Sequence, residues 1–177
     1  MVFAPLWSDV RLQCIADESH AFPADSRINT RCGTCSELLS LKYKWGPADA
    51  AQYNDAWCRR RSSNRPEDVS KVFRYREVLP FGPEVYDNGR FVTLAEGNHP
   101  LIEAPQSADY AAVDRLYIMH QGIGNPTGSF KDLGMCVAVT QAGLQGYENL
   151  GCASTGNTAA SMAAYARRAG MKSVVLV

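Results

Sequence analysis

A lysine in a loop rich in glycine and proline is the residue of this sequence with the clearest potential for chemistry. The loop, Gly122 to Asp132, reads GIGNPTGSFKD and carries Lys131 near its end. Its glycines and proline force a sharp turn, and Thr127 and Ser129 are good helix caps, so a helix is expected to begin around Lys131. A positive charge is unfavourable at a helix N-terminus, which favours the neutral amine that forms an imine with an aldehyde. The common alternative is an ordinary surface lysine in the first turn of a helix.

A second polar turn, Ala153 to Ser161, reads ASTGNTAAS and has the same character. Backbone N–H groups at a helix start, with hydroxyl groups beside them, form an anion site that suits a carboxylate or a phosphate. An ordinary helix cap by Ser154 or Thr155 is the alternative. Both turns follow predicted strands, and ligands of parallel sheets bind beyond the carboxyl ends of the strands. We therefore expect the two turns to line one site.

The elements around these turns alternate between strand and helix. Apolar runs predict strands at 115–119, 149–153 and 173–177, and helical patterns predict helices at 131–144 and 159–169. This alternation predicts an α/β fold in which a parallel sheet carries helices on both faces. A further short β-type run lies at 90–94.

The first third of the chain has a different composition. Residues 1–46 carry three cysteines, turn residues and one short apolar run, which predicts a small β-rich module. Residues 47–71 are polar and predict an irregular or helical linker, and 72–177 hold the α/β pattern. The last predicted strand has no following helix to cover it, so we expect a truncated protein.

Charge and hydropathy exclude several classes of partner. Lysine and arginine together number 18, as do aspartate and glutamate, so the formal net charge is zero. No overall field would attract nucleic acid or an anionic membrane surface. No segment approaches the ~20 apolar residues of a membrane span, and the first residues lack the pattern of a secretion signal. The expected location is the cytoplasm, where the six cysteines would be reduced.

Several motifs together resemble those of a known family. Asn125 to Asp132 (NPTGSFKD) and Ser154 to Thr158 (STGNT) look like the lysine and asparagine loops of the fold-type II pyridoxal-phosphate enzymes. The stretch 73–80 (FRYREVLP), the turn 96–101 (EGNHPL) and the cysteine module narrow the resemblance to threonine synthases. It covers nearly all of this chain, but only the first part of a family member. Two departures, Leu133 where arginine is usual and His99 where threonine is usual, remove no catalytic atom.

The resemblance implies a lyase of amino-acid biosynthesis that uses pyridoxal 5′-phosphate to convert O-phospho-L-homoserine and water into L-threonine and phosphate. Lys131 would bind the cofactor and move protons, and Asn157 would hydrogen-bond the 3-oxygen of its ring. The substrate α-carboxylate would be bound by the asparagine loop, namely Ser154, Thr155, Gly156, Asn157 and Thr158. The complete enzyme could form a homo-oligomer. The remaining cofactor contacts would lie beyond Val177, so the 177-residue chain alone is expected to be inactive.

The cysteines near the N-terminus resemble the first half of a zinc ribbon. Cys14 precedes a Cys32-Gly33-Thr34-Cys35 knuckle, which is typical of zinc-binding modules. The family pattern would place a further cysteine at position 17, where this chain has Asp17, a less usual zinc ligand. His20 and Cys58 are the other candidates for a fourth ligand. A ribbon folded without metal is favoured, so no metal ligand is assigned and little bound zinc is expected.

Two other kinds of function stay open from the sequence. The first is another fold-type II pyridoxal-phosphate enzyme, either threonine dehydratase or cysteate synthase. Dehydratases usually lack the cysteine module, whereas cysteate synthase is a close alternative. The second is a non-catalytic module that binds an anion at Ser154 to Thr158. Visible absorption of a lysine-bound cofactor would separate an enzyme from a simple anion binder.

Overall fold

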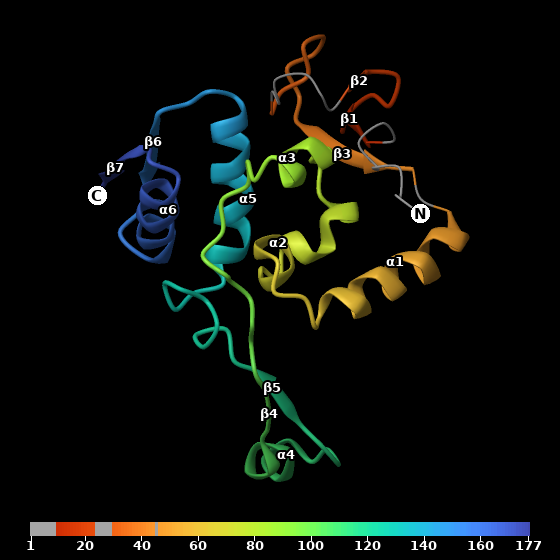
Figure 1. Ribbon diagram of the computed structural model, residues 1–177, viewed down its shortest axis with the longest axis vertical. Coiled ribbons are helices and arrows are strands. Elements are labelled where there is room, and N and C mark those ends of the chain that lie inside the picture. The colour runs from red at the N-terminus through yellow and green to blue at the C-terminus, as the bar shows by residue number, and fades with distance from the viewer. Residues whose placement is uncertain (1–9, 24–29, 45) are drawn as a thin grey trace. The chain divides into compact units, whose positions relative to one another are not determined.

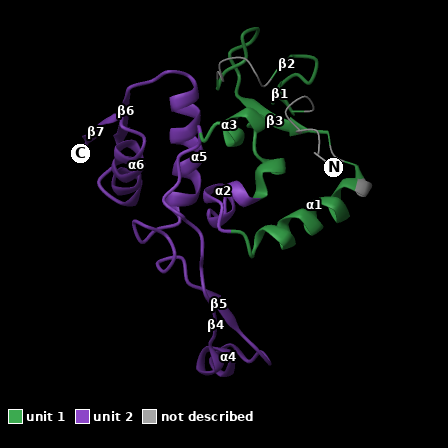
Figure 2. Ribbon diagram, in the orientation of Figure 1, with its two compact units in different colours: residues 1–63, 75–89 green, residues 64–74, 90–177 purple. Residues whose placement is uncertain are grey.

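The structure is a computed structural model that describes residues 10–23, 30–44 and 46–177. Contacts within the chain define two compact units (Figure 2). Unit 1 comprises residues 1–63 and 75–89, and unit 2 comprises residues 64–74 and 90–177. The boundaries expected at residues 46 and 71, between the cysteine module, the linker and the α/β region, stay a prediction. None of the described helices is both long and apolar enough to cross a membrane.

Unit 1 is built on a three-stranded antiparallel sheet in the order β2-β1-β3 (Figure 1). Its strands are β1 (Val10–Cys14), β2 (Ala21–Pro23) and β3 (Leu39–Tyr43). Alternate residues of β1 are buried because successive side chains of a strand point to opposite faces. On this sheet Val10 packs against Leu41, Tyr43 and Tyr53.

A glutamate holds helix α1 (Pro47–Arg60) in unit 1. The Glu77 carboxylate accepts hydrogen bonds from Trp57 Nε1 at 3.0 Å and from Arg60 Nη1 at 2.8 Å. Burial alone would raise the pKa of Glu77, but the hydrogen bonds from Arg60 and Trp57 outweigh it and lower that pKa. Unit 1 also contains α3 (Pro83–Asp87), and a 3₁₀ helix (Phe73–Val78) crosses the boundary between the units.

Unit 2 is organised around two helices, α5 (Lys131–Leu144) and α6 (Asn157–Arg168), which pack against each other (Figure 1). Helix α6 connects β6 (Asn149–Ala153) to β7 (Lys172–Leu176), and the two strands pair in parallel. This strand, helix and strand unit confirms the predicted parallel pairing. Helix α5 has the predicted bounds, whereas α6 begins two residues before the predicted start. A short helix, α2 (Pro66–Val69), also belongs to this unit.

Two sequence-based predictions about strands in unit 2 are wrong. β5 (Tyr117–Met119) pairs antiparallel with β4 (Leu101–Glu103) and not with the β6–β7 pair. The connection between β4 and β5 contains α4 (Pro105–Ala111) and reverses the chain, so the two short runs meet side by side. A short apolar run indicates a strand but does not identify its partner.

The run at 90–94 forms no strand. The N–H of Val92 donates to Thr140 Oγ1 on α5 at 2.8 Å, instead of to a neighbouring strand. The backbone groups of a five-residue β-type run can form hydrogen bonds with side chains of a packed helix instead of with a neighbouring strand. Tertiary contacts decide between these two partners.

Candidate functional site

Two turns of unit 2 pack backbone against backbone and set the position of the lysine loop. The N–H of Gly97 donates to the carbonyl of Gly124 at 2.9 Å. Gly124 has a φ of +92°, and a Cβ there would lie 2.5 Å from the carbonyl oxygen of Asn98. Only glycine fits this position, because the left-handed conformation and the close approach both exclude a side chain. The 96–98 turn is therefore fixed against the loop that leads to Lys131.

A buried glutamate links the same turn to helix α6. Glu96 is fully buried, and its carboxylate accepts from Leu94 N at 3.0 Å and from Tyr165 Oη at 2.7 Å. The hydroxyl groups of Thr93 and Ser70 also donate to it. Burial, together with the hydrogen bond to Glu96, raises the pKa of Tyr165, so its phenol stays a donor at neutral pH. This network holds one side of the site rigid.

Lys131 is the first residue of α5, as its loop predicted. Its N–H donates to Ser129 Oγ at 3.2 Å. The next residue, Asp132, is fully buried and accepts from Thr127 N at 2.8 Å and Thr127 Oγ1 at 2.6 Å. The Lys131 Nζ atom lies 4.4 Å from the centroid of the Phe130 ring. The backbone of the lysine is thus fixed on both sides, while its side chain is only half-buried.

The asparagine loop ends in helix α6, whose cap is Gly156 and whose first residue is Asn157. Because the cap residue is a glycine without a side chain, neither Ser154 nor Thr155 is the cap of this helix. Instead Ser154 Oγ accepts from the N–H of Gly156 at 3.3 Å. The first N–H groups of a helix, here those of Asn157 and Thr158, have no acceptor within the helix. The space on the Cβ side of Gly156 is open, since no atom beyond the adjacent residues lies within 4 Å of the position that a Cβ would occupy.

One hydrogen bond connects the starts of the two helices. Ser161 Oγ on α6 donates to Asp132 Oδ1 on α5 at 2.6 Å, and both residues are fully buried. Ser161 lies four residues after Asn157 and therefore on the same side of α6. Asp132 directly follows Lys131. The bond thus holds the lysine loop and the asparagine loop in a fixed relation.

The exposed groups of this site fit an anionic ligand that carries an aldehyde. Among the described residues, no carboxylate pairs with Lys131 Nζ, and no group hydrogen-bonds the exposed side chain of Asn157. An amine without an ion-pair partner can attack an aldehyde. In the part of the chain that the structure describes, the N–H groups of Asn157 and Thr158 have no acceptor, so they can bind a carboxylate beside Gly156. The residues present therefore fit pyridoxal phosphate.

Sequence reasoning missed the residues that support the site, namely Asp132, Ser161, Glu96 and Tyr165. In the sequence, Asp132 is only part of a motif, and Ser161 is only the end of a polar turn. One signal was present in the sequence: Ser161 and Tyr165 are spaced by four residues, so they share the buried face of α6. The sequence alone does not show that the Ser161 hydroxyl donates to Asp132 or that the Tyr165 hydroxyl donates to Glu96.

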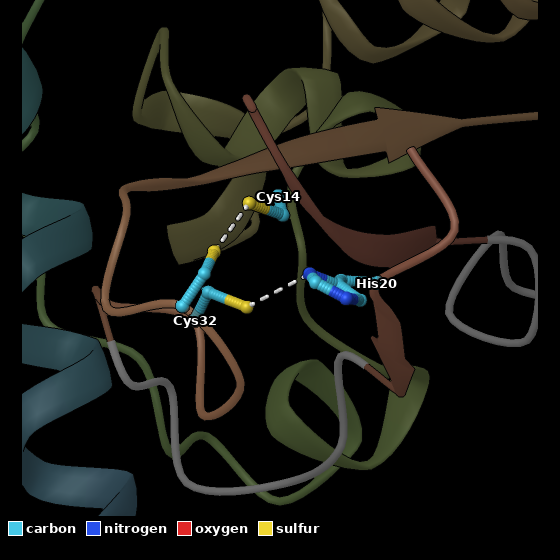
Figure 3. Close-up of side chains that lie close together, drawn as sticks. Cys14, His20 and Cys32 are labelled. Atoms are coloured by element: carbon cyan, nitrogen blue, oxygen red, sulfur yellow. Dashed lines mark hydrogen bonds between the residues drawn. The ribbon is translucent and has the colours of Figure 1, made fainter. Parts of the chain in front are cut away.

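A second cluster of chemically active side chains lies in unit 1 (Figure 3). One ligand atom from each of Cys14, His20, Cys32 and Cys35 lies within 4.8 Å of all the others. Cys14 Sγ is 3.4 Å from Cys35 Sγ, and Cys32 Sγ is 3.7 Å from His20 Nδ1. Of the candidates for a fourth ligand, His20 joins the cluster. Cys58 is an exposed residue of α1 and is not a member.

Asp17 is not a member of the cluster either, but it stands behind His20. Its Oδ2 atom lies 3.6 Å from Nε2 of that ring. Its Oδ1 atom accepts from Ser19 N at 2.9 Å and Ser19 Oγ at 2.7 Å. These hydrogen bonds lower the pKa of Asp17. The carboxylate is therefore held in place and charged at neutral pH.

The thiols of the knuckle differ in acidity. Burial opposes ionisation of Cys32, but N–H groups of Cys35 and Thr34 point at its sulfur and lower its pKa to about 6. An N–H from Glu37 favours the Cys35 thiolate, yet the Cys14 and Cys32 thiols and burial together outweigh it, and the pKa of Cys35 rises to about 11. The cluster therefore contains one thiol that ionises readily beside one that does not.

Comparison with known proteins adds independent information. Residues 92–177 match the family model described as pyridoxal-phosphate dependent enzyme. The chain is 43% identical over 166 residues to a threonine synthase of Methanosarcina acetivorans, a match that covers 94% of this chain and 36% of that protein. It is 48% identical over 106 residues to a threonine synthase of Methanocaldococcus jannaschii, covering 60% of this chain and 25% of the relative.

A threonine synthase of Synechocystis is 49% identical over 104 residues, covering 58% of this chain and 26% of the relative. The matches to these three relatives thus span only about a quarter to a third of the relatives' length. The longest match extends over both units, because it includes 94% of the chain.

Proposed function

We propose that this chain, whose residues 92–177 match the pyridoxal-phosphate dependent enzyme family, is the N-terminal part of a threonine synthase. The reaction would convert O-phospho-L-homoserine and water into L-threonine and phosphate. The relatives compared above are all threonine synthases, which favours this activity over those of threonine dehydratase or cysteate synthase. A match to an enzyme family also argues against a non-catalytic anion-binding module.

The observation that best supports the proposal is the 2.6 Å hydrogen bond between Ser161 and Asp132. It connects the helix that begins at Lys131 with the helix that begins at Asn157. An amine and an amide that serve one ligand need such a fixed relation, because a displacement of about 1 Å can cost on the order of a hundredfold in rate.

Each residue of the site would have a separate task. Pyridoxal phosphate, when bound, supplies an electron sink for negative charge at substrate carbons. Lys131 would hold the cofactor through Nζ and afterwards carry protons to and from substrate carbons with the same atom. Asn157 would donate from its side-chain amide to the 3-oxygen of the cofactor ring. The loop from Ser154 to Thr158 would bind the α-carboxylate of the substrate through its hydroxyl and N–H groups.

Further properties of the whole protein follow from this proposal. The substrate would be an amino acid that carries a phosphate group. Nucleic acid is not expected as a partner, because the formal net charge of the chain is zero. An enzyme of amino-acid biosynthesis would act in the cytoplasm, and the complete enzyme could form a homo-oligomer.

The role of Lys131 can be tested on the product of the complete reading frame. The purified protein is incubated with pyridoxal phosphate, reduced with borohydride, digested and mapped by mass spectrometry. The expected result is label on Lys131 and phosphate release from O-phosphohomoserine. Lys131→Arg keeps the positive charge but cannot form the bond to the aldehyde, so label and turnover should both be lost.

Lys172 offers a matched control, because it lies in the same unit at the start of β7 with an exposed side chain. Lys172→Arg should keep both label and turnover. Label on a lysine other than Lys131 would contradict the assignment of the site. Label on Lys131 without phosphate release would retain the site and contradict the proposed reaction.

A further inference from the structure

We propose that Cys14, His20, Cys32 and Cys35 bind one structural zinc ion, with Asp17 orienting the ring of His20. Zinc prefers four ligands in a tetrahedron, with zinc–sulfur distances of about 2.3 Å and zinc–nitrogen distances of about 2.0–2.1 Å. Such ligands lie roughly 3.5–3.8 Å from one another. The observed separations of 3.4 Å between Cys14 Sγ and Cys35 Sγ and 3.7 Å between Cys32 Sγ and His20 Nδ1 are close to these values, and all four ligand atoms lie within 4.8 Å of one another.

The backbone brings the four ligands together from separate segments. Cys14 is the last residue of β1, and His20 directly precedes β2, so the two ligands flank the connection between these strands. The N–H of Cys14 donates to the carbonyl of His20 at 3.0 Å, which closes this connection. Figure 3 shows the labelled side chains of Cys14, His20 and Cys32 converging. The fold thus brings these side chains within reach of one ion.

The knuckle between Cys32 and Cys35 has the geometry of a thiolate site. The N–H of Thr34 points at Cys32 Sγ at a distance of 3.4 Å. The N–H of Ser36 donates to the carbonyl of Cys32 at 2.9 Å, which closes the turn. N–H groups that point at sulfur stabilise a negative thiolate, the form that binds metal.

Asp17 has the position of an outer partner of a metal-bound histidine. Nδ1 of His20 faces Cys32, and Nε2 on the other side of the ring faces the Asp17 carboxylate at 3.6 Å. A carboxylate behind a ligating histidine fixes the ring and selects the nitrogen that binds the metal. Ser19 holds Asp17 there through two hydrogen bonds.

The sheet of unit 1 has a physical need for such a site. Its three strands contain only five, three and five residues, and Val10 of β1 packs against three partly buried hydrophobic residues. Modules of this size bury too little apolar surface for independent stability and usually depend on a metal or a disulfide. The four cysteine and histidine ligands lie where a zinc ion would hold β1, β2 and the knuckle together.

This inference departs from the sequence-based prediction of a module that holds little zinc. That prediction treated Asp17 as the replacement for a missing cysteine ligand. The structure places a histidine in the cluster and the aspartate behind it, so the ligand set is Cys₃His, a usual set for structural zinc.

The first test measures zinc in the full-length protein, purified under reducing conditions, by elemental mass spectrometry. We expect one zinc per chain in the wild type. Cys32→Ser and His20→Ala should lose most of it, and the exposed Cys58→Ser, outside the cluster, should keep all of it. Absence of zinc together with a Cys14–Cys35 disulfide would overturn the proposal. Full zinc in both His20→Ala and Cys32→Ser would overturn it as well.

A second test does not depend on whether His20→Ala folds. The zinc is replaced by Co²⁺, whose visible spectrum reports tetrahedral geometry and whose near-ultraviolet bands report bound thiolates. His20→Cys supplies a fourth thiolate in place of the imidazole, so it should keep the metal and strengthen the thiolate bands. Unchanged bands in His20→Cys would show that residue 20 is not a ligand.

The role of Asp17 is tested by chelator competition. Asp17→Asn should keep one zinc per chain and the Co²⁺ spectrum, but bind zinc about 10–100-fold more weakly, as expected for a lost outer-shell partner. Glu18→Gln is the matched control, because Glu18 is an exposed neighbour outside the cluster. Equal zinc affinity in the wild type and in Asp17→Asn would overturn the orienting role.

Discussion

Replacing Asp132 by alanine should loosen the site more than any other single change near Lys131. The carboxylate is fully buried and accepts three hydrogen bonds, from Thr127 N, Thr127 Oγ1 and Ser161 Oγ, at 2.6–2.8 Å. Each hydrogen bond to a charged group contributes about 1.5–3 kcal/mol. The sum overestimates the loss, because the two hydroxyl groups can rotate and because burial of the charge has its own cost. We expect a destabilisation of roughly 3–5 kcal/mol.

Asparagine at position 132 separates the loss of charge from the loss of the contacts. With its carbonyl oxygen toward Thr127 N, its amide group can donate to the hydroxyl oxygens of Thr127 and Ser161. The hydrogen bonds persist but involve a neutral side chain, so Asp132→Asn should lower the free energy of unfolding by only about 1–2 kcal/mol. Ser161→Ala removes a single contact and should cost a similar amount.

The measurement is urea unfolding of the cofactor-free protein, followed by circular dichroism. All tryptophans precede residue 60 and therefore belong to unit 1, so tryptophan fluorescence does not report unit 2 directly. The helical circular dichroism signal includes the helices of unit 2 and is the better readout for it. Borohydride labelling of Lys131 at limiting cofactor is the second readout and should fall in Asp132→Ala. The reasoning is refuted if Asp132→Ala unfolds within about 1 kcal/mol of the wild type, or if asparagine costs as much as alanine.

Three other predictions follow from contacts described above. Gly124→Ala should destabilise the protein by at least about 2 kcal/mol, because a left-handed backbone costs about 1–2 kcal/mol and the new Cβ would clash with Asn98. Gly134→Ala, with open space on helix α5, should instead stabilise by about 0.5–1 kcal/mol; equal effects in urea unfolding would contradict the packing of the two turns. The lowered pKa of Glu77 stabilises unit 1 above its ordinary pKa of about 4.5, and this contribution is lost as the pH falls through the lowered value. The difference in tryptophan-detected stability between wild type and Glu77→Gln should therefore shrink below about pH 4.5, and a constant difference would argue against the ion pair. Finally, the 177-residue chain by itself should release no phosphate from O-phosphohomoserine above a Lys131→Ala control, since its matches to the compared relatives span 25–36% of their length.

Local sequence was sufficient for the elements whose signals are short-ranged. Glycine and proline before Lys131 placed the start of α5 correctly, and Gly146, with a φ of +80°, lies just after its end. The apolar runs around α6 predicted the parallel pair β6–β7, because strands joined through a helix pair in parallel. These features depend on residues within one or two turns of each other.

Contacts between distant residues decided the rest. The strand partner of β5, the pairing of Val92 with Thr140 and the burial of Glu96 against Tyr165 join residues 14–69 positions apart. The cysteine cluster shows the same limit. The sequence indicated three cysteines and several candidates for a fourth ligand, but only the fold turned His20 toward Cys32 and Asp17 toward the far side of its ring. Spacing along the chain predicts local conformation, whereas the direction of a side chain toward a distant partner depends on how the backbone packs.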